Sequence, residues 1–341
     1  QDQADGTLAL EEKGTVYNEM VSSMDQPDRR VDSAAGEMIY GSEHPLAFNS
    51  GGSPEALRII QPNDIRTFHA AHYHLANSGA IVAVPTDMSM ASVLERFDER
   101  LNGLEPENPG LRVLTEADLP ASVPAPVGEI RYVDYPHENP EQPGALWFAW
   151  PAERDLDLSG QTLLSLFLET LAGDPTTNLY KRFIDSSTRE LDLGAQSVFA
   201  FASEDKGHPV TVGFRDVPVA RMNDTDISDL RDRILDELRL VASWERGSDE
   251  LRAFNERLRS RVVQQRRDLS KLVNSPPEFG LRGRGIGWIT HLHSLAGETG
   301  FRRSLTMKPV LEEVERILTE DTNVWARYME EWKLIDAEPW A

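Results

Sequence analysis

Cysteine, an excess of basic charge and long apolar runs are all missing from this chain. None of its 341 residues is cysteine, which excludes disulfides and cysteine-ligated metals. The 35 Lys and Arg residues stand against 57 Asp and Glu residues, and the net charge of −22 argues against partners with phosphate or anionic-lipid surfaces, such as nucleic acid. No apolar stretch reaches the ~18 residues that a membrane span needs. The sequence therefore predicts a soluble acidic protein without membrane insertion, of about two domains by length.

The chain also lacks the histidine motifs of zinc hydrolases. It has eight histidines: His44, His69, His72, His74, His137, His208, His291 and His293. None of them begins an H-x-x-E-H or an H-E-x-x-H sequence. Catalytic zinc normally takes three protein ligands and leaves one position open for water. The chain alone is therefore predicted to be inactive as a zinc enzyme of either kind.

The most informative run that is present covers residues 14–20, Gly-Thr-Val-Tyr-Asn-Glu-Met. Apolar residues recur at helical spacing around it, which predicts a helix over residues 6–30 that enters a turn at Pro27. Glu12 and Glu19 are seven residues apart, two helical turns, so they share one face of that helix. Two carboxylates on one face are either solvated surface residues or part of a polar site.

Further motifs follow in a fixed order. A Ser50-Gly51-Gly52 loop stands before Pro54, and a helix is expected over residues 62–74. Phe68-His69, Tyr73-His74 and Asn77 lie at the end of that helix. A buried strand is expected over residues 78–85 and an amphipathic helix over residues 89–101.

The second half alternates strands and helices. Residues 103–126 contain several prolines and read as a linker. The expected strands cover residues 131–134, 144–150, 197–202 and 210–214, and the expected helices cover residues 157–171, 179–185 and 227–244. Residues 249–334 read as mostly helical, with interruptions at Pro276-Pro277 and in the glycine-rich run 283–287. This pattern predicts an α+β fold.

The ordered motifs resemble the pitrilysin/insulinase zinc metallopeptidases, closest to their presequence-protease branch. The resemblance implies two homologous-type α/β units, each an antiparallel-rich sheet packed with helices, followed by a helical hairpin. The implied domains are residues 1–105, the C-terminal part of the zinc-site domain; 106–126, a linker; 127–248, a second peptidase-like domain; and 249–341, a helical connector. The chain would be the middle of such a protein, without its H-x-x-E-H motif.

The same resemblance implies a role for the two glutamates. Glu19 matches the family's distal zinc ligand, and Glu12 matches a second carboxylate that would hold a histidine ligand or the water network. Asn18 would bond nearby backbone. The cofactor would be Zn²⁺, with two histidine ligands that this chain does not contain. The substrates would be short unfolded peptides, degraded in a closed chamber by a zinc-dependent endopeptidase.

Other interpretations of these residues stay open. A non-catalytic family member could act as a scaffold or partner subunit, and a plain acidic interaction module would leave the ordered motifs unexplained. His69 and His72 have a possible ligand spacing, as do His291 and His293, but structural roles are favoured. The chain opens with Gln1, so its natural N-terminus is expected to have been removed. Missing N- and C-terminal segments or a partner chain would complete it, in a bacterial periplasm or exterior or in an organelle matrix.

Overall fold

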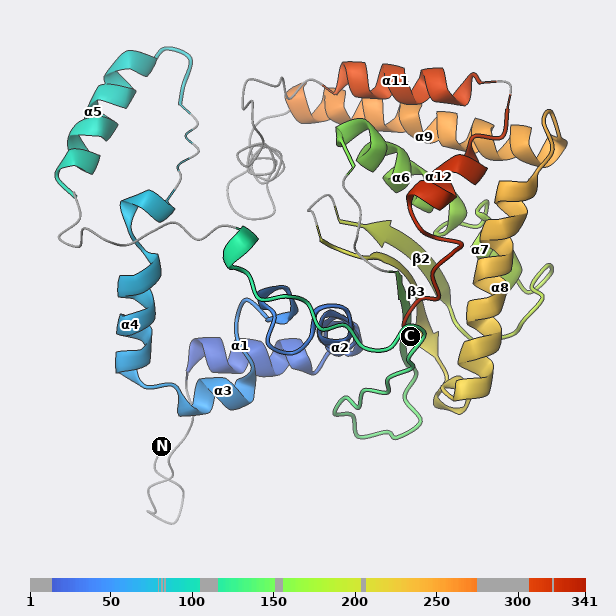
Figure 1. Ribbon diagram of the computed structural model, residues 1–341, viewed down its shortest axis with the longest axis horizontal. Helices are drawn as coiled ribbons and strands as arrows, with labels where there is room; N and C mark the ends of the chain where they lie inside the picture. The colour runs from blue at the N-terminus through green and yellow to red at the C-terminus, as the bar shows by residue number, and fades with distance from the viewer. Residues whose placement is uncertain are drawn as a thin grey trace. The chain divides into compact units, whose positions relative to one another are not determined.

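The computed structural model describes residues 14–78, 80, 82, 84–104, 116–150, 156–203, 207–274, 307–320 and 322–341 (Figure 1). Its contacts divide the chain into two compact units. Unit 1 comprises the described residues of Gln1–Val21 and Asn49–Ala121, and unit 2 those of Ser22–Phe48 and Ser122–Ala341. The boundary falls near the end of helix α1, Thr15–Met24.

Unit 1 consists of short helices in its described part. After α1 come α3 (Pro54–Ile59), α4 (Pro62–His72) and α5 (Met90–Asn102). Proline at the first turn starts α3 and α4, where its missing N–H is not needed. The Ser53 hydroxyl caps α3 by accepting a hydrogen bond from the Ala56 amide at 3.1 Å. None of these four helices contains a buried residue, so the described part of unit 1 has no core of its own.

The strand expected over residues 78–85 is wrong for the residues that the structure describes there. Ser78, Ala80, Val82 and Val84 belong to no strand, and 53% of Val82 is exposed. A strand needs a neighbour for its backbone N–H and C=O groups. The described part of unit 1 offers none, because it contains no strand.

Unit 2 is built on a three-stranded antiparallel sheet in the order β1-β3-β2. The strands are β1 (Gly144–Trp150), β2 (Ser197–Ala202) and β3 (Val210–Val217), which confirms the three expected strands in this region. Alternate side chains share a face. The core face carries Leu146, Phe148, Trp150, Val198, Val212 and Phe214.

Helices cover the core face of this sheet. They are α6 (Leu158–Leu171), α7 (Asn178–Phe183), α8 (Asp224–Ser243), α9 (Asp249–Asn274), α11 (Lys308–Leu318) and α12 (Trp325–Glu331). In Figure 1, α9 and α11 run side by side beyond α6. The helices meet at aromatic rings. Phe167 of α6 lies 5.5 Å from the Phe254 ring of α9 and 5.1 Å from the Trp325 ring of α12.

Helix α2 (Pro27–Tyr40) packs against β1 on the other face of the sheet. The expected break at Pro27 is confirmed, because Pro27 starts this helix. A small second cluster joins Met38, Ile39 and Tyr40 of α2 to Ala149 and Trp340. Trp340 also pairs with β1, since its amide bonds the Ala149 carbonyl at 3.0 Å. The C-terminal residues are therefore part of unit 2.

The strand expected over residues 131–134 is wrong. These residues are extended but belong to no strand. Trp340 takes the place beside β1 that a strand here would need, and the Arg131 amide instead bonds the Ala341 carbonyl at 2.8 Å. Further along, the Asp134 carbonyl accepts from Arg30 at 2.9 Å.

The helices after residue 249 do not stand apart from the sheet. Phe254, Leu311 and Trp332 lie in the same buried cluster as Phe148 and Phe214. The expected division into a second domain and a connector at residue 248 remains a prediction. The interruptions at Pro276-Pro277 and residues 283–287 lie outside the described residues.

We predict that Phe167→Ala destabilises unit 2 by about 3–5 kcal/mol, because it leaves a cavity among three aromatic rings. The free energy of unfolding is measured with urea, with tryptophan fluorescence as the signal. Phe201→Ala is the control, since 44% of Phe201 is exposed and its loss leaves no buried cavity. An equal loss of unfolding free energy in both variants would show that Phe167 stabilises the core no more than an exposed ring does.

Gly213 on β3 is the second position where packing is tight. A Cβ atom there would lie 2.2 Å from Cζ of Phe199, whose ring covers the glycine. Gly213→Ala is therefore expected to cost about 1–3 kcal/mol through overpacking. Gly36→Ala on α2 is the matched control, because its Cβ would come no nearer than 3.4 Å to a neighbour. If both variants had the same melting temperature, the packing of the Phe199 ring would not require glycine at position 213.

Candidate metal centre and a pocket beside β1

Helix α1 presents Glu19 on its exposed side. The helix is anchored by its other residues, Tyr17 and Met20, which lie three positions apart and so share a face. The Arg58 side chain donates from Nε to the Tyr17 hydroxyl at 2.8 Å, and its guanidinium carbon lies 4.9 Å from the centre of the Tyr17 ring. This face of α1 is thereby fixed to α3.

Met20 reaches the glycine loop. A Cβ atom built on Gly51 would lie 2.1 Å from the Met20 sulfur, so the Met20 side chain packs directly on this glycine and would have to move if a side chain were added there. The structure therefore brings together two motifs that are 30 residues apart in the sequence, the Asn-Glu-Met run and the Ser-Gly-Gly loop. Glu19 follows Asn18 on the side that this packing leaves exposed.

The side chain of Glu19 makes no hydrogen bond or ion pair with any residue that the structure describes. Its carboxylate is a suitable oxygen donor for zinc, but it is one donor where a catalytic site needs three. Within the described ranges, no group of three histidine or acidic side chains could hold a metal ion. Glu12, the second predicted carboxylate, lies outside the described residues. The described part of this chain therefore offers one of the three protein ligands that a catalytic zinc site needs.

The histidines of α4 are held by aromatic neighbours. His69 stacks on Tyr73 with ring centres 4.6 Å apart, and His72 stacks on Phe68 at 4.2 Å. Nδ1 of His72 also lies 2.9 Å from the Phe68 carbonyl oxygen. These contacts are structural. His291 and His293 lie outside the described residues.

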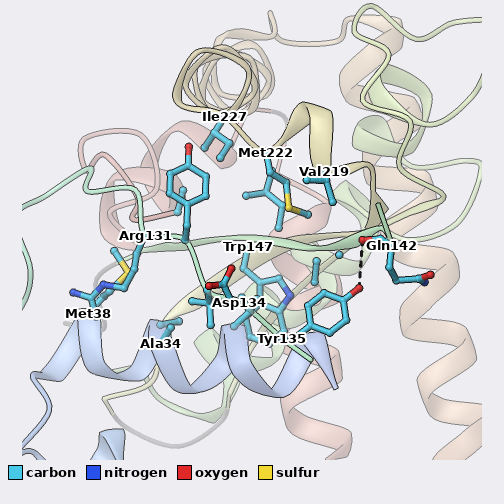
Figure 2. Close-up of a pocket in the computed structure, with 18 of the residues that line it drawn as sticks. Ala34, Met38, Arg131, Asp134, Tyr135, Gln142, Trp147, Val219, Met222 and Ile227 are labelled. Carbon is cyan, nitrogen blue, oxygen red and sulfur yellow. Dashed lines mark hydrogen bonds between the residues drawn. The ribbon is translucent and has the colours of Figure 1, made fainter. Parts of the chain in front are cut away.

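A second candidate site, which the sequence did not reveal, lies within unit 2. We call this pocket, of about 300 Å³, the β1-edge pocket. Its walls are α2, the extended segment 131–142, the start of β1, and residues 219–227. Figure 2 shows Ala34 and Met38 pointing up from α2 and Val219, Met222 and Ile227 facing them, with Asp134 and Trp147 between. The sequence did carry one signal for this segment, because proline prevents regular strand pairing. The segment and its end contain three prolines, Pro136, Pro140 and Pro143.

Two tyrosines fix the extended segment of the pocket. Tyr135 donates its hydroxyl hydrogen to the Pro143 carbonyl at 2.9 Å, and burial together with the charge of Asp216 raises the pKa of its phenol. Desolvation and a 2.5 Å hydrogen bond to Asp224 raise the pKa of Tyr132 to about 12. Both phenols therefore remain neutral donors at physiological pH, and they hold the segment beside β1.

The described helices include none that is long and apolar enough to cross a membrane. The comparison with family models gives no match. Curated relatives match part of the sequence, and two of them are presequence proteases. A mitochondrial presequence protease from Gibberella zeae is 34% identical over 109 residues, 31% of this chain and 10% of that protein. A mitochondrial presequence protease from Eremothecium gossypii is 30% identical over 103 residues, 30% of this chain and 10% of that protein. The match thus spans about a tenth of these relatives.

Solved structures share the fold over a larger part of the chain. A protease from Helicobacter pylori has a TM-score of 0.57 at 16% identity, and the match covers 88% of this chain and 66% of that one. A protein from Alicyclobacillus acidocaldarius, described as M16-like peptidase, has a TM-score of 0.51 at 19% identity, with 90% and 67% covered. The α+β fold is that of M16-like peptidases. The partial sequence matches and the shared fold both support a resemblance to the pitrilysin/insulinase-like peptidases.

Proposed function

We propose that this chain supplies Glu19 as the distal ligand of a zinc-dependent endopeptidase that degrades short unfolded peptides in a closed chamber. The observation that carries the proposal is the exposed, unpaired carboxylate of Glu19 on a helix whose opposite face is fixed by Tyr17 and Met20. A ligand held in this way keeps its direction while its oxygens stay open to a metal. The resemblance to the pitrilysin/insulinase-like peptidases is what favours a metal role over a solvated surface glutamate.

Two histidines from polypeptide outside this sequence would complete the donor set. A bound zinc ion would supply Lewis-acid chemistry and a water of lowered pKa. Glu12 would hold a histidine ligand or the water network from the same side of the helix. The chain's own part is to add a negative donor and to orient it. Of the compartments considered, the names of the two relatives favour an organelle matrix.

The alternative is a scaffold or partner subunit of the same fold that binds no metal. It is favoured by the absence of an H-x-x-E-H sequence from all 341 residues. The two functions differ in whether Glu19 matters for zinc. A scaffold would keep its fold and its partner when Glu19 is changed, and would carry no zinc before or after.

We predict that Glu19→Gln lowers the zinc affinity of the completed assembly by at least about tenfold, since losing even an outer partner of a ligand costs about 10–100-fold. Peptidase activity on an unfolded peptide falls with it. Zinc content is measured by elemental analysis after dialysis against a chelator. Glu95→Gln on α5 is the matched control, because Glu95 is exposed too. One zinc per assembly in both variants would overturn the ligand role, and no zinc in the unchanged assembly would favour the scaffold.

Unit 1 also indicates how the assembly is completed. Met90, Leu94 and Phe97 lie on one side of α5 at helical spacing, and 53%, 59% and 41% of them is exposed. An apolar stripe of this kind is normally covered by protein. We propose that the polypeptide with the missing histidines covers it, either as further segments of a longer protein or as a partner chain.

Leu94→Glu is expected to weaken the association of unit 1 with this polypeptide by about tenfold or more, because it places a charge where a leucine is buried. Ser92→Glu is the matched control, since it adds the same charge on the opposite side of α5. Affinity is measured by titrating the separately produced histidine-bearing segment. Equal affinities for the two variants would show that the stripe is not the contact.

A further inference from the structure

Helix α1 carries the proposed zinc ligand and has little stability of its own. It is ten residues long, and isolated helices shorter than about 12–15 residues are marginal in water. It contains no buried residue, and its last turn contains no basic side chain to offset the partial negative charge of its final carbonyls. Its order, and the direction in which Glu19 points, therefore depend on what neighbouring residues supply.

Arg30, on the following helix α2, supplies the missing cation at the end of α1. Its Nε donates to the carbonyl oxygen of Met24, which is the last residue of α1. Its Nη1 donates to the carbonyl oxygen of Asp134, in the extended segment 131–142, at 2.9 Å. An arginine that bonds a terminal carbonyl satisfies an acceptor that the helix itself cannot satisfy, and it interacts favourably with the helix dipole. Arg30 therefore caps the C-terminal end of α1.

The charge of Arg30 is directed at carbonyl groups and not at a carboxylate. Both of its hydrogen-bond acceptors are backbone carbonyls, and it forms no ion pair within the described ranges. The neighbouring Arg29 differs, because it pairs with Asp32 of the same helix at 3.6 Å and 62% of its side chain is exposed. Two adjacent arginines thus have separate roles. Arg30 holds the end of α1, and Arg29 lies on the surface of α2.

The capped end of α1 lies close to Glu19 along the helix. Met24 is five residues after Glu19, and helical hydrogen bonds join residues four apart, so the capped turn is the one that follows Glu19. When a last turn frays, the residues just before it lose the hydrogen bonding that fixes their backbone. A ligand needs a fixed direction to complete a metal site. The cap on Met24 therefore bears on Glu19 without contact between Arg30 and the carboxylate.

We propose that Arg30 is a positioning residue for the zinc ligand. It keeps the last turn of α1 helical and thereby holds the backbone of Glu19 in one direction. The inference rests on the proposed function for the role of Glu19 as a ligand. Arg30 touches neither metal nor substrate in this account and acts through α1 alone. Its loss therefore weakens zinc binding and turnover and leaves the binding of a peptide substrate unchanged.

The first test measures hydrogen exchange at the backbone amides of residues 15–24 in the 341-residue chain, with a chelator present. Arg30→Gln is expected to speed exchange in the last turn of α1 by about threefold or more, because the helix end loses its cation. Arg29→Gln is the matched control, since it removes the same charge from the adjacent position and leaves exchange unchanged. Equal exchange in Arg30→Gln and the unchanged chain, or no slowing of exchange in the unchanged chain, would overturn the cap.

The second test measures zinc affinity and the cleavage of an unfolded peptide by the completed assembly. Arg30→Gln is expected to lower zinc affinity by about three- to tenfold and to lower kcat, with KM unchanged. Arg30→Lys keeps the charge and is expected to restore part of the affinity, whereas Arg29→Gln changes neither quantity. Urea unfolding followed by tryptophan fluorescence checks that each variant keeps its fold. Unchanged zinc affinity in Arg30→Gln, despite faster exchange in α1, would make Arg30 a structural cap only and overturn the positioning role.

Glu19→Gln separates a failure of this inference from a failure of the proposed function. If zinc binding falls in Glu19→Gln but not in Arg30→Gln, the ligand role stands and the positioning role fails alone. If Glu19→Gln binds zinc like the unchanged assembly, the ligand role fails and the positioning role fails with it. The hydrogen-exchange test still decides in that case whether Arg30 caps α1, because it involves no zinc.

Discussion

The burial of apolar side chains around the sheet of unit 2 is the interaction on which the rest of this structure depends. Phe148, Phe167 and Phe214 are fully buried there, and the helices from α6 to α12 are arranged around them. A core of this kind supplies most of the favourable free energy of folding. It also fixes β1, α2 and residues 131–142, and thereby the shape of the β1-edge pocket. The pocket is a consequence of a well-packed unit.

Unit 1 lacks such a core in its described part. Its described helices contain no buried residue, and their apolar side chains, such as Leu94 and Phe97, are exposed. Its order comes from local contacts, such as those of Met20 with Gly51 and of Arg58 with Tyr17. Exposed apolar side chains of this kind are normally covered by further polypeptide, which would give unit 1 a core. On the proposed function, the polypeptide that covers these side chains would also be the one that brings the two histidines.

Sequence patterns predicted the elements of unit 2 well where periodicity and burial agree. The strands at β1, β2 and β3 alternate apolar residues, and α6 is apolar and capped by Asp157, so local pattern and tertiary packing favour the same structure. The pattern failed at residues 131–134, because Trp340, 206 residues after Asp134, takes the position beside β1. The pattern also failed at residues 78–85. A strand needs a neighbouring strand, and the apolar pattern of one segment cannot show whether such a neighbour exists.

The candidate site was predictable in part. Glu19 was found through the order of motifs around it, and the contact of Met20 with Gly51 gives that order a physical basis. Its role stays a prediction. The β1-edge pocket could not be found from the sequence, because α2, residues 131–142 and Trp340 meet only in the folded unit. The indole N–H of Trp147 is buried without a hydrogen-bond partner among the described residues, and this too follows from packing and not from the local sequence.

The most direct test of the central claim locates the zinc ion itself. Anomalous diffraction at the zinc edge, on crystals of the completed assembly, shows which side chains bind the metal. The account predicts one zinc ion about 2.0–2.2 Å from a carboxylate oxygen of Glu19, with two histidines from outside this sequence as the other protein ligands. A zinc ion bound without Glu19, or an assembly that cleaves peptides with no metal at this position, would contradict it.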